Sequence, residues 1–345
     1  MAQIRSKPFG VTKQGANVTE YILSNPGGLT VSVLDYGCII KNIIVPAKNG
    51  PVDVVLGHDT MADYEDDFTS SSSTCCGAFV GRYANRIENA VFTVGGKTYQ
   101  LEANNGPNHL HGCFSRKLYR VKSFGDTLLM EAESPDGEDG FPGNLKIAVR
   151  YTLTEDNAFR MDYRVSSDAD TIVNLTNHSY FNLTGCKAPV LSHIYMIRAD
   201  SITLADSIGI PTGELMSVTG TEYDYTSALS AEMRIKKMGK GYDINYKLNK
   251  SSDSPELAAI VVEPISGRVL KAYTTEPGMQ FYIPNSNMDY LTGHGGRIYG
   301  EYYGFCLEMQ HFPNSPNIPQ FPTTSLFPGD TYRQTTVYKF ETLSE

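Results

Sequence analysis

The chain has 345 residues, a length that fits about two domains of ordinary size or one large β domain. Hydrophobic residues make up 41% of it and charged residues 19%, a composition that argues against both a disordered chain and a membrane-spanning one. Lys and Arg total 29 against 38 Asp and Glu, which gives a net charge of −9 without any basic stripe, so a nucleic-acid-binding surface is not expected.

Short runs of alternating apolar and polar residues, joined by turn residues, recur along the chain. This period of two predicts antiparallel hairpins. In chain order the expected hairpin arms are residues 91–94 with 97–101, 118–124 with 127–131, 145–154 with 158–165, and 257–263 with 268–274, followed by a last strand at 335–341. Only residues 231–238 have the composition of a helix.

These strands predict an all-β fold. Short antiparallel strands joined by turns bury their apolar faces when sheets pack against each other, so we expect one large antiparallel β-sandwich. Glycine (31 residues) and proline (18 residues) are spread along the whole chain, and no linker or repeat divides it. Residues 1–345 are therefore expected to form a single domain.

The 6 cysteines are too few for a disulfide scaffold and form no Cys-x-x-Cys pair that would bind zinc. They are expected to be reduced thiols, including the adjacent Cys75 and Cys76, because a disulfide between neighbours is a strained ring. The N-terminal segment carries Arg5 and Lys7 with no apolar stretch behind them, so no signal peptide is expected. We expect a cytoplasmic protein that is a monomer or a homodimer.

The most polar segment runs from Asn174 to Asn182. Taken as a strand, it places Asn174, Thr176, His178, Tyr180 and Asn182 on one face. A face turned to water is one interpretation, because antiparallel sheets often expose one side. The segment lacks Lys and Glu, however, and side chains that both donate and accept hydrogen bonds also fit the wall of a cleft.

A second candidate lies in residues 305–310. Alternation puts Phe305, Leu307 and Met309 on an apolar face and Glu308 on the opposite face. Glu308 is either an ordinary glutamate at a sheet surface or a partly desolvated carboxylate that moves protons. The residues of this segment leave both interpretations open.

Two further pairs of polar residues are candidates for binding. His109 and His111 follow a turn-rich loop, and in an extended chain their imidazoles lie on one side. A His-x-His pair is a possible metal-binding element, but the residues just after it supply no carboxylate, so a site without metal is expected. Arg82 and Arg86 offer guanidinium groups for hydroxyls or an anion, although paired arginines are more often surface residues.

Seven segments together carry a family pattern. They are Asp53–Gly57, Gly81–Ile87, Pro107–Gly112, Asn174–Leu183, Gly241–Asp243, Pro277–Tyr282 and Cys306–Gln310. Their order and spacing resemble the aldose 1-epimerase (galactose mutarotase) family over essentially the whole chain. The resemblance implies a β-supersandwich and an isomerase that interconverts the α and β anomers of free aldohexoses such as galactose and glucose, with no cofactor and with a monosaccharide as the binding partner, not a nucleic acid or a membrane.

The resemblance also implies the roles of individual residues. His178, in the Asn-His-Ser segment, corresponds to the general acid of the family, and Glu308, in the Cys-Leu-Glu segment, to the general base. The sugar-holding positions are Asn85, Arg86, His111, Tyr180, Asp243 and Gln280. No metal ligand is implied, and Arg82 and His109 match the pattern less closely.

Departures from the family pattern are small. Cys113 stands where a second glycine is common after His111-Gly112, and the segment His311–Asn314 replaces a frequent Pro-Asp ending. Neither departure touches a proposed proton-transfer group. Both are expected to alter loop shape and therefore the preference for one sugar over another.

Three other functions would use the same residues. A glycoside hydrolase would pair Asp243 with Glu308 across a sugar cleft. A hexose-6-phosphate epimerase would need more than one cation for the phosphate, for which Arg82 and Arg86 are the candidates. A non-catalytic sugar-binding protein would not need both His178 and Glu308, but with 0 Trp its stacking surfaces would have to come from smaller rings.

Overall fold

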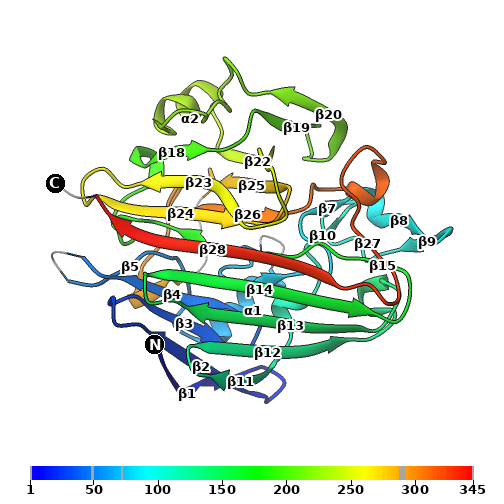
Figure 1. The fold of residues 1–345 in the computed structure, drawn as a ribbon, viewed down its shortest axis with the longest axis horizontal. Coiled ribbons are helices and arrows are strands. Elements are labelled where there is room, and N and C mark those ends of the chain that lie inside the picture. Colours follow the sequence, from blue (N-terminus) through cyan, green and yellow to red (C-terminus); the bar gives the residue numbers. More distant parts are fainter. Residues whose placement is uncertain (1, 48–49, 71–72, 287–291, 344–345) are drawn as a thin grey trace.

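The computed structural model describes residues 2–47, 50–70, 73–286 and 292–343. Most of the strands belong to three antiparallel sheets (Figure 1). The five-stranded sheet contains β1 (Gln3–Val11), β2 (Asn17–Ser24), β3 (Thr30–Leu34), β4 (Ile40–Val45) and β5 (Val52–Asp53). The six-stranded sheet contains, in spatial order, β17 (Tyr180–Phe181), β26 (Phe305–Gln310), β25 (Gly278–Ile283), β22 (Tyr242–Lys247), β19 (Ser201–Ala205) and β20 (Pro211–Ser217).

The third sheet is the largest and has nine strands. In spatial order they are β11 (Arg120–Phe124), β12 (Thr127–Ser134), β13 (Leu145–Leu153), β14 (Ala158–Ser167), β28 (Tyr332–Thr342), β24 (Arg268–Thr274), β23 (Glu256–Val262), β18 (Ile194–Ile197) and β21 (Leu229–Ser230). Four two-stranded ribbons join β6 (Phe79–Val80) to β16 (Thr176–Asn177), β7 (Arg86–Ile87) to β10 (His109–Leu110), β8 (Val91–Val94) to β9 (Lys97–Gln100), and β15 (Thr171–Ile172) to β27 (Ser325–Leu326).

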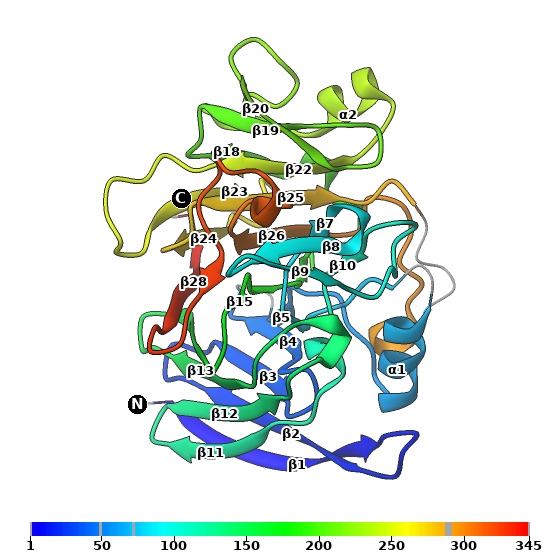
Figure 2. The ribbon, with the colours of Figure 1, turned by 90° about the vertical axis from the view of Figure 1, so that its right-hand side faces the viewer.

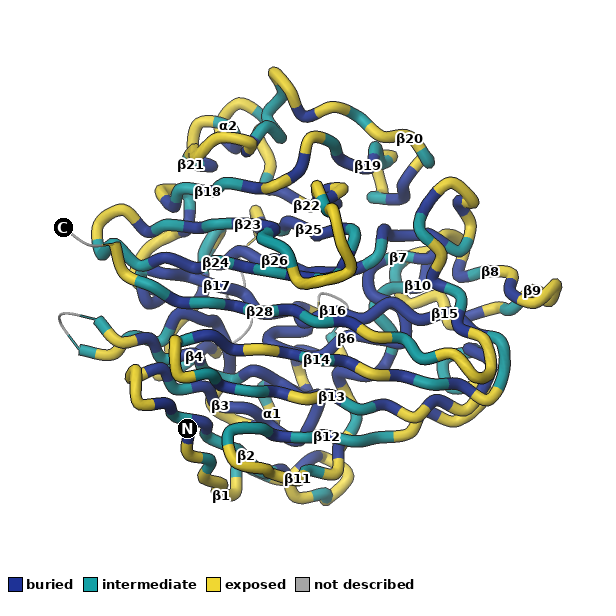
Figure 3. The backbone as a smooth tube through the Cα atoms, in the orientation of Figure 1, coloured by how far each residue is buried: buried dark blue, intermediate teal, exposed yellow. Residues whose placement is uncertain are grey.

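The nine-stranded sheet packs face to face on the other two large sheets (Figures 1 and 2). One hydrophobic cluster draws on all three, for example through Val33 of β3, Val149 of β13 and Phe281 of β25. Figure 3 shows buried residues recurring along the central strands, alternating with intermediate and exposed ones on β13 and β14, while continuous exposed stretches lie at loops and sheet edges. The predicted antiparallel β-sandwich is therefore confirmed.

All four predicted hairpins are present. Their innermost observed pairs are Val94 with Lys97, Phe124 with Thr127, Leu153 with Phe159, and Val262 with Val269. The last strand is longer than predicted, because β28 lies between β14 and β24 and exchanges hydrogen bonds with both. All six cysteines are buried free thiols, as expected.

The helices correct one prediction. The expected helix is present as α2 (Glu232–Met238), but α1 (Met61–Thr69) was not expected, so the view that only one segment is helical is wrong. The side chain of Thr60 caps α1 by accepting a hydrogen bond from the Asp63 N–H, and apolar residues recur every three or four positions on its buried face. Short 3₁₀ turns lie at Glu88–Ala90, Phe114–Arg116, Glu138–Gly140, Val190–Ser192, His294–Gly296 and Ser315–Asn317.

None of the helices in the described residues has the length and apolar character needed to cross a bilayer.

The segment Asn174–Asn182 is not one continuous strand. It contains only the two-residue strands β16 and β17, and all of its residues are buried, so the interpretation as a face turned to water is wrong. The backbone of His178 bonds to Gly77 and its neighbour, whereas Tyr180 pairs with Cys306 on β26. Because the chain changes partners at its centre, it cannot keep a single strand register.

The six-stranded sheet is the element that positions polar side chains together. Along β22, β25 and β26 the alternation sends Ile244, Met279 and Leu307 into the shared hydrophobic core. The intervening residues Asp243, Gln280 and Glu308 therefore lie on the other face. Gln280 is directly opposite Glu308 in the register, so the acidic and amide groups of neighbouring strands lie side by side.

Candidate active site

A cavity of about 650 Å³ opens over this polar face of the sheet. Seven of the eight site residues expected from the sequence line it: Asn85, Arg86, His111, His178, Tyr180, Asp243 and Glu308. They come from β7, β17, β22, β26 and the segments beside them. The volume falls within the roughly 300–1,000 Å³ typical of small-molecule sites and exceeds what one sugar ring needs.

The imidazole of His178 and the carboxyl group of Glu308 face each other at the wall of this cavity. Nε2 of His178 lies 3.6 Å from Oε1 of Glu308, and the two side chains are only 7% and 3% exposed. The other carboxyl oxygen of Glu308 has no hydrogen-bond partner among the described residues. One nitrogen and one oxygen are thus free to act on a molecule in the cavity, one as acid and one as base.

Burial changes the proton affinity of both groups. It lowers the pKa of His178 to about 4, because the charged imidazolium is poorly solvated there. Burial, reinforced by the negative charge of Asp243, raises the pKa of Glu308 well above its ordinary value, and the positive charge of Arg86 only partly opposes this. Both shifts favour the uncharged form of the group, and together they oppose the ordinary order in which a histidine holds its proton more tightly than a glutamate.

His111 presents a neutral N–H to the same cavity. Its Nδ1 accepts a hydrogen bond from the backbone N–H of Asn85 at 3.1 Å, which leaves the proton on Nε2. Burial, followed by the neighbouring charge of His178, holds the pKa of His111 well below its usual range. Asn85 and His111 both have a φ of 64°, a left-handed conformation that turns the chain at the cavity edge.

A chain of polar contacts fixes the opposite wall. The Nε group of Arg86 donates to Asn105 Oδ1 at 3.2 Å, and its Nη1 lies 3.6 Å from Asp243 Oδ2. Nε2 of Gln280 donates to the other oxygen of Asp243 at 2.5 Å. Gln280 is buried and does not line the cavity itself, so it reaches a ligand there through the carboxylate of Asp243.

Comparison with known proteins shows the family to which the chain belongs. The family model for aldose 1-epimerase matches residues 19–339. Galactose mutarotase from Bos taurus is 39% identical over 346 aligned residues, covering 99% of each chain. Aldose 1-epimerase from Escherichia coli K12 is 36% identical over 333 residues, covering 92% of this chain and 94% of its own. The chain belongs to the aldose 1-epimerase family.

Solved structures also match this family fold. The GalM/aldose epimerase homologue from C. elegans has a TM-score of 0.86 at 29% identity, covering 99% of this chain and all of that one (100%). The galactose 1-epimerase from Lactobacillus acidophilus NCFM has a TM-score of 0.84 at 24% identity and covers 100% of both chains. The resemblance inferred from the seven segments is confirmed.

Two residues with weaker family matches lie outside the site. Arg82 is 1% exposed, and its guanidinium donates hydrogen bonds to Ser134 and to the carbonyl oxygens of Pro135 and Pro142. His109 is equally buried, with Nδ1 at 2.8 Å from the Glu102 carbonyl oxygen.

The expectation that His109 and His111 lie on one side is therefore wrong. Strand β10 ends at Leu110, and the left-handed backbone of His111 breaks the alternation on which that expectation depends.

The cavity also includes residues that the sequence analysis did not select. Asn105 supports Arg86, and Tyr282 packs its ring at 6.1 Å and 72° to that of Tyr180. Tyr282 lies in one of the seven family segments, and two residues before it stands Gln280, so alternation along that strand would have identified it. Asn105 lies in a turn, where no periodicity indicates which way a side chain points.

The departures from the family pattern have local explanations. Gly112 has a φ of 73°, a conformation that favours glycine, but Cys113 has a φ of −114°, so a second glycine is not required there. The backbone N–H of His311 donates to the Asn174 side chain at 2.8 Å, and its Nδ1 lies 2.5 Å from Oε2 of Glu276.

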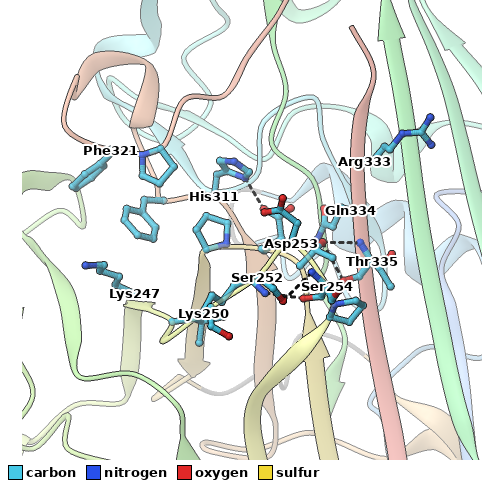
Figure 4. A pocket seen from close by; sticks show the side chains of 18 of the residues that line it. Lys247, Lys250, Ser252, Asp253, Ser254, His311, Phe321, Arg333, Gln334 and Thr335 are labelled. Atoms are coloured by element: carbon cyan, nitrogen blue, oxygen red, sulfur yellow. Dashed lines mark hydrogen bonds and ion pairs between the residues drawn. The ribbon is translucent and has the colours of Figure 1, made fainter.

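A second and larger cavity, of about 1280 Å³, adjoins His311 (Figure 4). Its floor includes Pro277 and Phe312, and the carboxylate of Glu276 is buried beside it. Both oxygens of that carboxylate are occupied, one by His311 and the other by the hydroxyl of Tyr332 at 3.3 Å. The carboxylate of Glu276 is thus fully occupied, whereas one oxygen of Glu308 has no hydrogen-bond partner among the described residues, so we propose the smaller cavity as the site of the chemistry.

Three groups of the smaller cavity have the spacing of a possible cation site. The nearest ligand atoms of His111, His178 and Glu308 lie within 4.8 Å of one another. Imidazole and carboxylate ligands of this kind suit a divalent transition metal. A metal bound there would occupy Nε2 of His178 and the carboxylate of Glu308, the same atoms that an acid and a base need. The site without metal expected from the sequence stays a prediction.

Substitutions of Arg82 and Arg86, both in the segment Gly81–Ile87, should separate an effect on stability from an effect on sugar binding. We expect Arg82→Lys to lower the free energy of unfolding by about 2–4 kcal/mol, because several buried carbonyl oxygens lose their partner. Arg86→Lys should leave stability nearly unchanged and raise the KM for the sugar, because a lysine cannot contact Asn105 and Asp243 together. Urea unfolding and initial rates measure the two effects, and equal loss of stability in both variants would contradict the assignment.

Glu308→Gln should stabilise the protein at alkaline pH. The pKa of Glu308 is raised in the folded state, so above about pH 4.3, where the unfolded chain ionises, the folded state must either keep a proton or bury a charge. The resulting loss of unfolding free energy grows by about 1.4 kcal/mol per pH unit until the pH reaches the pKa of Glu308 in the folded state. A glutamine has no ionisable group and causes no such loss. Urea unfolding at pH 8 and pH 4 measures it, with Glu133→Gln at an exposed position as the control. A stability gain that is the same at both pH values would contradict the prediction.

Proposed function

We propose that this protein is an aldose 1-epimerase that interconverts the α and β anomers of free aldohexoses such as galactose and glucose. The observation that carries the proposal is the buried pair of His178 and Glu308 beside a cavity large enough for one sugar ring. Full-length similarity to curated galactose mutarotases supports it. The substrate is accordingly a monosaccharide, and which aldose is preferred depends on the loops around the cavity.

The proposed reaction needs one base and one acid at two oxygens of the same sugar. Glu308 takes the proton of the C1 hydroxyl, the bond between C1 and the ring oxygen breaks, and His178 gives a proton to that oxygen. The product is the open-chain aldehyde. Rotation about the C1–C2 bond turns the other face of the carbonyl to the hydroxyl, and the reverse proton transfers close the ring. No cofactor or covalent enzyme intermediate enters this scheme.

The environment of the pair suits proton transfer in both directions. Burial lowers the pKa of His178 to about 4 and raises that of Glu308. A protonated His178 is therefore a stronger acid, and an ionised Glu308 a stronger base, than either group is in water. Because both shifts oppose the ordinary order of the two pKa values, histidine's usual preference for the proton does not oppose its transfer from His178 through the sugar to Glu308.

The remaining groups are proposed to hold the hydroxyls. Arg86 and the Nε2–H of His111 donate hydrogen bonds, Asp243 accepts them, and Asn85 and Tyr180 border the ring. Gln280 is proposed to act by fixing Asp243, since its contact with the cavity runs through that carboxylate. A site built from directed polar groups discriminates strongly against sugars that lack the matching hydroxyl.

A single domain over residues 1–345 is supported by a hydrophobic cluster that includes both Ala2 and Phe340. A cytoplasmic location is supported by the six free thiols and by three formal glycosylation sequons whose asparagines, Asn174, Asn177 and Asn182, are buried. A monomer or a homodimer is expected, and light scattering decides between them.

The alternative function, a hexose-6-phosphate epimerase, needs more than one cation for the phosphate. Arg82, one of its two candidates, is enclosed in the core and cannot contact a phosphate in the cavity.

Removing the acid or the base should slow the reaction strongly. We expect His178→Asn and Glu308→Gln each to lower the rate of anomer exchange by a factor of ~10² to 10⁴, the usual contribution of a positioned acid or base. Polarimetry on freshly dissolved α-galactose and α-glucose, corrected for the spontaneous rate, measures it. Glu133→Gln, at an exposed position, is the control. Activity of either variant within about twofold of wild type would reject these roles.

Metal ions should inhibit the reaction instead of supporting it. We expect EDTA to leave the rate unchanged and added Zn²⁺ to lower it, because the metal competes with the sugar for His178 and Glu308. The inhibition should be relieved by excess sugar and should weaken in His111→Asn, which removes the third ligand. Loss of activity in EDTA with recovery on adding zinc would overturn the proposed mechanism.

A further inference from the structure

The proposed mechanism places a requirement on the nitrogen of His178 that does not face the sugar. When the imidazolium gives up its proton at Nε2, the ring becomes neutral only if Nδ1 keeps a proton of its own. A ring that carried its single proton on Nε2 could not act as an acid without becoming an imidazolate. In a buried site the retained Nδ1–H needs a hydrogen-bond acceptor.

The side-chain group at this position is a thiol. Sγ of Cys306 lies 3.7 Å from Nδ1 of His178 and is a side-chain partner of that nitrogen among the described residues. A backbone hydrogen bond within His178 also favours the charged imidazole. Cys306 has 0% exposure and precedes Glu308 by two residues on the same face of β26. The same strand thus contacts one nitrogen of the imidazole through Cys306 and faces the other through Glu308.

A second histidine in this protein illustrates the alternative. Nδ1 of His311 lies 2.5 Å from the carboxylate of Glu276 (Figure 4). Burial alone would lower the pKa of His311, but the charge of Glu276 and its hydrogen bond more than offset this, so the pKa is raised. For His178, a backbone hydrogen bond and the more distant charges of Asp67 and Asp243 offset burial only in part, and its pKa falls to about 4. Burial also raises the pKa of the Cys306 thiol, which stays uncharged.

We propose that Cys306 is a positioning residue for the general acid: its sulfur accepts the Nδ1–H of His178, confines proton exchange to Nε2, and adds no negative charge. A carboxylate in its place would hold the imidazolium more firmly and weaken it as an acid. A neutral sulfur is a weak hydrogen-bond acceptor, so it fixes the proton on Nδ1 without strongly stabilising the positive charge of the imidazolium. This inference rests on the proposed role of His178 in anomer exchange.

The test combines a spectroscopic and a kinetic measurement. ¹⁵N chemical shifts distinguish a protonated ring nitrogen from a bare one, and the spectrum of His178→Asn identifies the signals of His178 among the 7 histidines. In the wild type we expect the neutral ring to carry its proton on Nδ1. Cys306→Ala should move the proton to Nε2 and lower kcat by about 10- to 100-fold, the range found when an outer partner of a functional histidine is removed, with KM unchanged.

Two further variants separate positioning from packing. Cys306→Ser keeps an acceptor and should restore the Nδ1 proton and most of kcat. Cys186→Ala removes a buried thiol of the same size that contacts the Val55 carbonyl oxygen, and it should change neither measurement. The inference is overturned if Cys306→Ala leaves the proton on Nδ1, or if its kcat matches that of Cys186→Ala. If the wild type does not accelerate anomer exchange, the proposed function fails, while the ¹⁵N result still reports on the contact.

Discussion

The desolvation of one imidazole and one carboxyl group, held 3.6 Å apart, is the constraint on which the site depends. In water a histidine holds a proton about two pKa units more tightly than a glutamate. Burial disfavours the charged form of each group, so both shifts oppose this ordinary preference. An imidazolium that no longer holds its proton more tightly than the carboxyl group can give that proton up to a sugar oxygen more readily. The same desolvation destabilises the folded protein, because it keeps a carboxyl group away from water.

The sandwich fold offsets this destabilisation and holds the polar residues of the site in a rigid sheet. The strands β22, β25 and β26 satisfy their backbone hydrogen bonds within the six-stranded sheet, and their apolar residues fill the core shared with the nine-stranded sheet. The residues between them are therefore held at fixed spacing without any loop. Glu308 is placed on a strand, where a side chain is positioned more precisely than on a loop. His178 lies between β16 and β17, where its backbone hydrogen bonds to Gly77 and Ala78 hold it. Asn85 and His111, the proposed hydroxyl-binding groups, lie where the backbone turns, and their left-handed conformations are fixed by contacts around them.

Identical residue types have opposite roles in this protein, and the difference lies in what surrounds them. Arg82 is enclosed by carbonyl oxygens and holds the core, whereas Arg86 reaches the cavity beside Asp243. His178 and His311 are both buried, but one contacts a thiol and the other a carboxylate, so their pKa values shift in opposite directions. Neither a count of residue types nor their order in the chain determines these environments.

The sequence by itself determined the β-sandwich and the catalytic strand, because period-two alternation at residues such as Phe305–Gln310 is a local property that survives folding. It also allowed the family and the eight site residues to be proposed, through short segments whose spacing is recognisable. It could not determine that Asn174–Asn182 is buried and changes partners at its centre, that only His111 of the His109 and His111 pair reaches the cavity, or that Gln280 lies behind Asp243. Those outcomes depend on partners distant in the chain, since hydrogen bonds and burial between sheets are decided only when the sheets pack.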